Sequence, residues 1–69
     1  MRQAETILSK GIVYRKGTVL EGKLGTKTVY RVIENIYLSE RTGTVYFTFH
    51  NGSISTLEQV NSNYRVMEG

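Results

Sequence analysis

The residues that catalysis requires are scarce in this sequence. His50 is its only histidine, and cysteine and aspartate are absent, so an activated nucleophile would have to combine Ser or Thr with His50 and a glutamate. No local motif brings such residues together, and one histidine with scattered glutamates lacks the spacing of a metal site. The alternation of the preceding residues predicts that His50 is exposed beside a turn. We therefore expect a protein that is not an enzyme and that needs no cofactor or metal.

Basic and aromatic residues are the other groups with binding potential, and the basic ones are unevenly distributed. Residues 1–33 hold seven Lys and Arg against two Glu, and residues 34–69 hold two against four; these give +5 and −2, which sum to the net charge of +3. A basic half suggests a polyanionic or acidic partner. Aromatic rings stack on bases while Lys and Arg meet phosphates, so RNA or DNA is the predicted ligand. The predicted contact residues are Arg15, Lys16, Lys23, Lys27, Arg31, Tyr14 and Tyr46.

Two other kinds of partner fit the same composition. Tyrosine and arginine also dominate protein interfaces, so the chain is alternatively a module that binds an acidic protein surface or inhibits a host or defence protein. Edge strands in residues 17–22 (GTVLEG) or 64–68 (YRVME) offer a route to a homo-oligomer. Tyr30 and Tyr64 are expected to fill the core rather than to bind.

The length of 69 residues predicts a single small domain. A chain of this size hides only about 60% of the surface that its unfolded form exposes, and without cysteine no disulfide reinforces it. The N-terminus lacks the apolar core of a signal peptide, and no stretch approaches the roughly 18 apolar residues of a membrane span. We expect a cytoplasmic protein with no membrane partner.

Residues 11–69 are assigned to the domain, and residues 1–10 to an N-terminal segment that is partly helical or frayed. Helical turns in residues 2–9 would lay Ala4, Ile7 and Leu8 against the domain.

The domain itself has the turn residues and alternation of an all-β protein. Residues 11–22 lie between glycines and are rich in β-branched side chains, which predicts a long strand followed by a turn in residues 24–26. Residues 27–40 are long for one strand, and their apolar pattern slips near Glu34-Asn35, which predicts a bend. In residues 43–50 apolar and polar side chains alternate, so one face of that strand is expected in the core and the other in water.

The end of the chain predicts a hairpin and a short helical turn. Asn51-Gly52 favours a type I′ turn, after which residues 53–56 return antiparallel. Ile54, Leu57 and Val60 then recur with the period of a helix, and Ser55 with Glu58 fits a capping box. A final short strand over residues 64–68 places Tyr64 and Val66 inward.

This order of elements resembles a small SH3-like barrel. The resemblance lies in GTVYFTFHNGSISTLEQVNSNYRVM, where a hairpin leads through one helical turn into the last strand, together with GTVLEG and the bent YRVIENIYL. It is similar to the short SH3-like proteins that phages and prophages encode, which implies five strands, diverse binding partners and, if the chain is phage-encoded, a location in the host cytoplasm. Because fold does not imply function, the resemblance supports the architecture and leaves the partner open.

Overall fold

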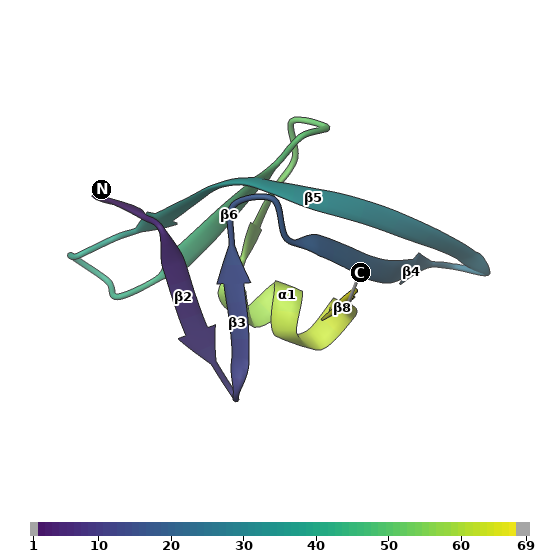
Figure 1. The fold of residues 1–69 in the computed structure, drawn as a ribbon, viewed down its shortest axis with the longest axis horizontal. Helices are drawn as coiled ribbons and strands as arrows, with labels where there is room; N and C mark the ends of the chain where they lie inside the picture. The colour runs from purple at the N-terminus through teal and green to yellow at the C-terminus, as the bar shows by residue number, and fades with distance from the viewer. Residues whose placement is uncertain (1, 68–69) are drawn as a thin grey trace.

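The computed structural model describes residues 2–67, which form eight strands and one helix (Figure 1). In chain order these are β1 (Arg2–Ala4), β2 (Thr6–Ser9), β3 (Ile12–Arg15), β4 (Val19–Leu24), β5 (Lys27–Leu38), β6 (Val45–Phe49), β7 (Ile54–Thr56), α1 (Leu57–Asn63) and β8 (Tyr64–Val66). The predicted all-β class is confirmed.

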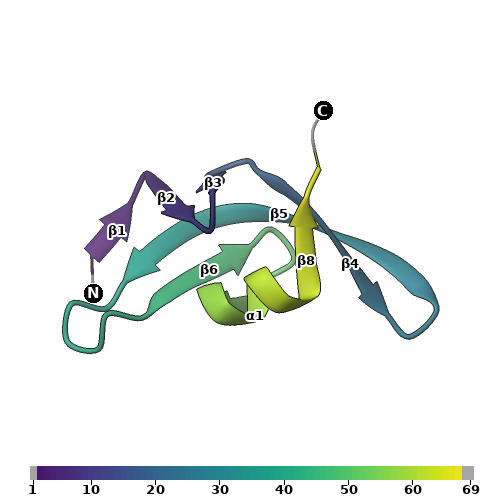
Figure 2. The same ribbon diagram turned by 90° about the horizontal axis from the view of Figure 1, so that it is seen from below.

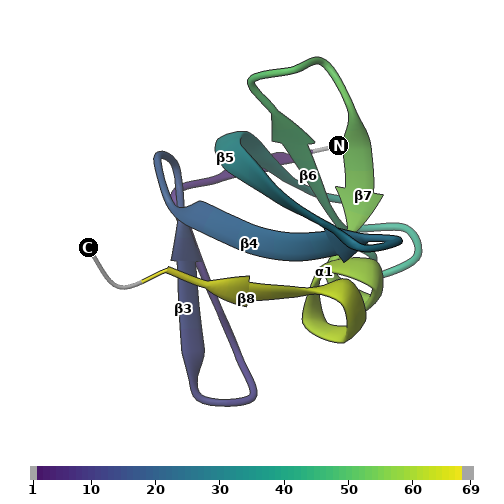
Figure 3. The ribbon, with the colours of Figure 1, turned by 90° about the vertical axis from the view of Figure 1, so that its right-hand side faces the viewer.

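Six of the strands form one antiparallel sheet. Its main path runs β7-β6-β5-β4-β8, and β1 pairs with the end of β5. The β4–β5 hairpin extends the sheet to the end of the molecule opposite the N-terminus (Figure 1). β2 and β3 form a separate two-stranded ribbon that projects from the body (Figure 3). α1 connects β7 to β8 and contacts β6, β7 and β8 (Figure 2).

The core lies between the inner face of the sheet, α1 and β3. Val45, Phe47 and Phe49 are buried, as their alternation predicts, while the residues between them face outward. The buried side chains of the core are those of Tyr14, Leu20, Ile33, Ile36, Val45, Phe47, Phe49 and Val60. Two tilted ring contacts organise it: Tyr14 with Phe47 at 5.4 Å between centroids and Phe49 with Tyr64 at 6.1 Å.

The predicted bend in the long strand is confirmed. β5 changes register between Ile33 and Asn35, where Ile33 pairs with Phe49 and Asn35 with Thr48. The extra residue, Glu34, lets both Ile33 and Ile36 point into the core although their numbers differ in parity.

The sheet is open, and the predicted closed barrel of five strands is wrong in that respect. β7 and β8 end the main path and are not paired with each other among residues 2–67. The predicted single strand over residues 11–22 is divided, because the chain turns at Lys16–Gly17 and Gly17 has φ of 86°. β3 therefore joins the ribbon and β4 joins the sheet.

The predicted N-terminal helical turn is also wrong, because residues 2–9 form β1 and β2. Cross-strand partners decide this: β1 pairs with the end of β5 and β2 pairs with β3, and these contacts override a local helical preference. Ala4 and Ile7 pack against the core as expected, but Leu8 is 71% exposed because strand geometry turns it to the opposite side from Ile7.

The hairpin between β6 and β7 forms as predicted, but its turn is not type I′. Only Gly52 has a positive φ (88°), whereas a type I′ turn requires one at Asn51 as well. The amide of Gly52 donates to the carbonyl of Phe49, and the amide of Phe49 donates to the carbonyl of Ser53. The loop is therefore three residues long, and the side chain of Asn51 accepts hydrogen bonds from Ser53.

The capping box exists one residue later than predicted. Thr56 is the N-cap of α1: its hydroxyl accepts from the amide of Gln59, and the Gln59 side chain accepts from the amide of Thr56. The box predicted from Ser55 and Glu58 is wrong because β7 continues through Thr56. α1 is seven residues long rather than one short turn.

A type I′ turn occurs instead at the tip of the ribbon. Lys10 has φ of 53° and Gly11 has φ of 77°, and Ser9 pairs with Ile12 across them.

We expect Gly11→Ala to lower the free energy of unfolding by about 1–2 kcal/mol, since a Cβ there meets no atom within 4 Å and the cost is conformational alone. Lys10→Asn should raise it, because Asn tolerates the left-handed region better. Urea unfolding measures both, and a Gly11→Ala variant as stable as the parent protein would contradict this turn assignment.

One predicted edge strand is an internal strand. β4, which contains most of GTVLEG, pairs with β5 on one side and with β8 on the other. Of the two predicted edges only β8 lies at the end of the sheet. Glu68, the last residue of that predicted strand, lies outside the described residues.

Candidate interaction surfaces

The five predicted basic residues occupy two separate places. Lys23, Lys27 and Arg31 lie on the β4–β5 hairpin, whereas Arg15 and Lys16 lie at the base of the ribbon, next to the middle of β5. The structure thus brings three of the five together and not the other two.

The β4–β5 hairpin, residues 19–32, presents its cations on both faces. Cross-strand partners share a face, so Lys23 and Thr28 lie on one side with the neighbouring Glu21–Tyr30 pair. Lys27 and Arg31 lie on the other. Gly25, with φ of 64°, supplies the positive φ of the two-residue turn at the tip.

Within residues 2–67, no carboxylate forms an ion pair with the cations of the hairpin. Lys23 donates from Nζ to the hydroxyl of Thr28 at 3.2 Å, and the Arg31 guanidinium donates to the carbonyl of Tyr30 at 2.9 Å. Within the described chain, the ion pairs are Arg2 with Glu40 and Arg65 with Glu21, so Lys23, Lys27 and Arg31 take part in none.

Tyr30 is exposed and belongs to this surface. We expected it in the core, but it is 54% exposed because it lies on the face of the hairpin opposite the buried Leu20. Tyr64, by contrast, packs against the core as predicted.

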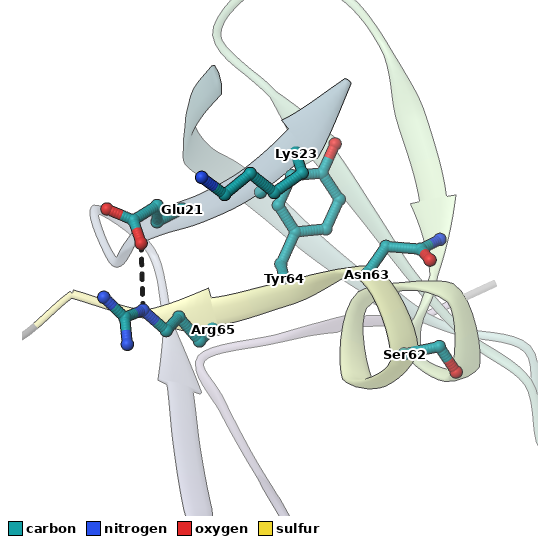
Figure 4. Close-up of a pocket in the computed structure, with 7 residues that line it drawn as sticks. Glu21, Lys23, Ser62, Asn63, Tyr64 and Arg65 are labelled. Atoms are coloured by element: carbon teal, nitrogen blue, oxygen red, sulfur yellow. Dashed lines mark hydrogen bonds and ion pairs between the residues drawn. The ribbon is translucent and has the colours of Figure 1, made fainter. Parts of the chain in front are cut away.

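A hollow of about 450 Å³ lies beside the hairpin, between β4, β8 and the end of α1 (Figure 4). On the wall of this hollow, the Arg65 guanidinium donates to a Glu21 carboxylate oxygen at 2.9 Å. The Tyr64 ring covers Gly22 so closely that a Cβ at Gly22 would lie 2.6 Å from two ring carbons. Glycine is required here by the close approach of the ring, since its φ is not positive.

Tyr14 is not available to a ligand, so its place among the predicted contact residues is wrong. It is 1% exposed and packs on Phe47. Its hydroxyl donates to Oδ1 of Asn61 at 2.7 Å, and Nδ2 of Asn61 donates to the hydroxyl of Ser9 at 3.1 Å. Burial raises the pKa of the Tyr14 phenol above its usual value of 10.0. This chain of hydrogen bonds fixes the ribbon to α1.

Tyr46 lies far along the sheet from the basic hairpin. The outward-facing side chains in this part of the sheet form two rows, and Tyr46 belongs to the first. In the first row Gln3, Tyr37, Tyr46 and Thr56 are successive cross-strand partners on β1, β5, β6 and β7. In the second row Asn35, Thr48 and Ile54 are partners on β5, β6 and β7. We name these seven residues the tyrosine face.

An apolar groove of about 420 Å³ crosses the tyrosine face. It is lined by Tyr37, Tyr46, Thr48 and Ile54, and Ile54 is 64% exposed at its edge. The Oγ1 atom of Thr48 is buried there with no hydrogen-bond partner within residues 2–67. Tyr37 is not among the binding residues predicted from the sequence. The slip at Glu34-Asn35 was the signal that would have found it, because it brings Tyr37 into phase with Tyr46.

The remaining candidates offer less chemistry. His50 is exposed at the β6–β7 turn, as predicted. Residues 2–67 contain no group of three or more His, Asp or Glu placed to hold a metal ion. No helix in the described part of the chain is long and apolar enough to cross a membrane.

Comparison with protein-family models, with curated proteins and with solved structures finds no match to this chain.

Proposed function

We propose that this chain is a non-enzymatic binding module whose β4–β5 hairpin contacts RNA or DNA. The observation that carries the proposal is the cluster of Lys23, Lys27 and Arg31, free of ion pairs in the described chain, beside an exposed Tyr30. Cations meet phosphates and an exposed ring stacks on a base, which is the combination that single-stranded nucleic acid requires.

Cations on both faces of the hairpin suit a ligand that surrounds it. A pair of antiparallel strands such as the β4–β5 hairpin fits the major groove of a duplex, where phosphates lie along both sides of the strands. Lys23 would meet one backbone, and Lys27 with Arg31 the other. A single-stranded ligand would instead follow one face, where Lys23 and Tyr30 lie together.

Glu21 is the one carboxylate on the hairpin, and its pairing with Arg65 limits its repulsion of phosphate. Residues 19–32 carry three cations and one anion, which is a net charge of +2. The net charge per residue of the hairpin is higher than that of the whole chain, so the hairpin attracts a polyanion more strongly than an average stretch of the chain does.

We also infer that the main path of the sheet is an SH3-like arrangement. Its support is the strand order β7-β6-β5-β4-β8 and the position of α1 between β7 and β8. β1 and the ribbon are additions to that arrangement. The likeness to phage-encoded proteins stays a prediction.

Fluorescence anisotropy with labelled single-stranded and duplex RNA and DNA tests the proposal. The wild-type protein should bind at low salt, with affinity that falls steeply as salt rises. Lys23→Ala/Lys27→Ala should reduce the slope of log K against log salt by about two, one for each lost phosphate contact.

Arg15→Ala/Lys16→Ala is the matched control, because it removes the same charge from the base of the ribbon and should leave the slope unchanged. Equal losses in both double variants would contradict a hairpin site. If no oligonucleotide binds even at low salt, nucleic acid is excluded and an acidic protein surface becomes the leading ligand for these cations.

A further inference from the structure

Arg65 on β8 is a further cation beside the hairpin, although it is paired with Glu21. The pair uses only one of its donors: Nε of Arg65 donates to Oε1 of Glu21 at 2.9 Å. A guanidinium carries five N–H donors, so this bond leaves the four on the terminal nitrogens for another acceptor. The side chain of Arg65 is 77% exposed, whereas that of Glu21 is 19% exposed. A ligand therefore reaches the arginine more readily than the carboxylate.

Strand register places Arg65 on the same face of the sheet as Tyr30 and Lys23. Tyr30, Glu21 and Arg65 are successive cross-strand partners on β5, β4 and β8. Because neighbouring strands lie about 5 Å apart, the Cα atoms of Tyr30 and Arg65 are separated by about 10 Å. Lys23 is two residues from Glu21 on β4, so it is a diagonal neighbour of Arg65 at about 7–8 Å. Figure 4 shows the head groups of Lys23, Glu21 and Arg65 on one side of β4 and β8.

This end of the molecule has the charge that a phosphate backbone requires. Addition of Arg65 to the net charge of +2 on residues 19–32 gives +3, which equals the net charge of the whole chain. Lys23 and Arg65 also line the hollow of about 450 Å³, so the space beside both cations is open to a ligand. The other carboxylate on β5 and β4 is that of Glu34 at the bulge, four residues from Tyr30 and about 13 Å away.

We propose that Arg65 binds phosphate in the nucleic-acid site and that Glu21 positions it; this inference rests on the proposed function. The Glu21 carboxylate holds Nε, which fixes the plane of the guanidinium and leaves its terminal nitrogens to the ligand. An oriented guanidinium donates two parallel hydrogen bonds to one phosphate, and it loses less side-chain entropy on binding than a freely rotating one. A strand of RNA or DNA then lies across β5, β4 and β8, with its phosphates on Lys23 and Arg65.

Salt titrations of binding test the role of Arg65. Fluorescence anisotropy with labelled mixed-sequence RNA and DNA, single-stranded and duplex, gives the slope of log K against log salt. Arg65→Ala should reduce that slope by about one, for one lost phosphate contact, and should weaken binding at low salt by about tenfold.

Arg2→Ala is the matched control. The side chain of Arg2 is 68% exposed, and its Nε also lies beside a carboxylate, that of Glu40 at 3.6 Å. β1 pairs with the end of β5 that lies away from the hairpin, so Arg2→Ala should leave the slope unchanged. Both ion pairs lie at the surface, so both variants should fold, and circular dichroism checks that they do.

Arg65→Lys separates the position of the cation from its charge. Lysine keeps the charge but lacks the planar fork that reaches Glu21 and a phosphate together. Arg65→Lys should therefore keep the slope of the wild type and still bind about threefold more weakly. Wild-type affinity in this variant would contradict positioning by Glu21.

Two further results would overturn the assignment of Arg65. If Lys23→Ala/Lys27→Ala lowers the slope and Arg65→Ala does not, the hairpin binds nucleic acid without Arg65, and only this inference is wrong. If Arg2→Ala lowers the slope as much as Arg65→Ala, the effect is one of total charge. Absence of binding to every oligonucleotide at low salt would instead reject the proposed function, and the phosphate contact of Arg65 with it.

Discussion

Replacing Tyr14 with alanine is expected to remove most of the stability of this protein. Large-to-small substitution of a buried aromatic residue costs about 3–5 kcal/mol. At 1% exposure, Tyr14 is such a residue, and it joins β3 to Phe47 and α1. A chain of this length is stabilised by only about 3–10 kcal/mol in total. Thermal or urea unfolding of Tyr14→Ala should show a much lower midpoint or no folded baseline.

Tyr14→Phe is the control that separates the ring from its hydroxyl. It keeps the packing on Phe47 and leaves Asn61 Oδ1 without its donor, so it should cost about 1–3 kcal/mol. A Tyr14→Ala variant no less stable than Tyr14→Phe would contradict the buried position of the ring.

The pH dependence of Tyr14→Phe provides a second check. Because burial raises the pKa of the Tyr14 phenol, the folded state holds its proton more tightly than the unfolded state. The associated stability is complete below pH 10.0, the unfolded value, and is lost as pH rises through the higher folded pKa. Tyr14→Phe should lose less stability than the wild type over that alkaline range.

Gly22→Ala is expected to destabilise the protein by about 1–3 kcal/mol, the usual cost of overpacking. The added Cβ would lie 2.6 Å from two carbons of the Tyr64 ring and 3.1 Å from the Asn63 carbonyl oxygen. The ring has little freedom to move away, because it also packs on Phe49. Urea unfolding measures the loss.

A double-mutant cycle with Tyr64→Ala tests the cause. Once the ring is gone, Gly22→Ala should be neutral or slightly stabilising, since alanine suits a strand better than glycine. Additive losses in the Gly22→Ala/Tyr64→Ala variant would show that the ring is not the obstacle.

The parts of the fold that the sequence predicted are those set by local patterns. Alternation from Val45 to Phe49 identifies a half-buried strand without knowledge of its neighbours. The slip at Glu34-Asn35 likewise marks the bulge within one strand. The hairpin at Asn51-Gly52 was predicted for the same reason, although its loop has three residues.

The parts that the sequence did not predict depend on distant partners. Residues 2–9 have no strong pattern, and their strands exist because β5 and β3 supply partners. Tyr14 and Arg15 point to opposite faces in any strand, but distant partners, the Phe47 ring and the Asn61 side chain, decide that Tyr14 faces inward. Strand pairing also separates Arg15 and Lys16 from the hairpin cations, because β3 pairs with β2 in the ribbon while β4 pairs with β5 in the sheet.

The links from Tyr14 and Ser9 to Asn61 also constrain how the chain folds during synthesis. These partners are separated by 47 and 52 residues, and Glu21 is separated from Arg65 by 44. Contacts so distant in sequence form only after a large loss of chain entropy, so they slow folding relative to local contacts. The core therefore closes only after α1 and β8 have left the ribosome, and a nascent chain that stops before α1 leaves the Tyr14 hydroxyl without its acceptor on Asn61.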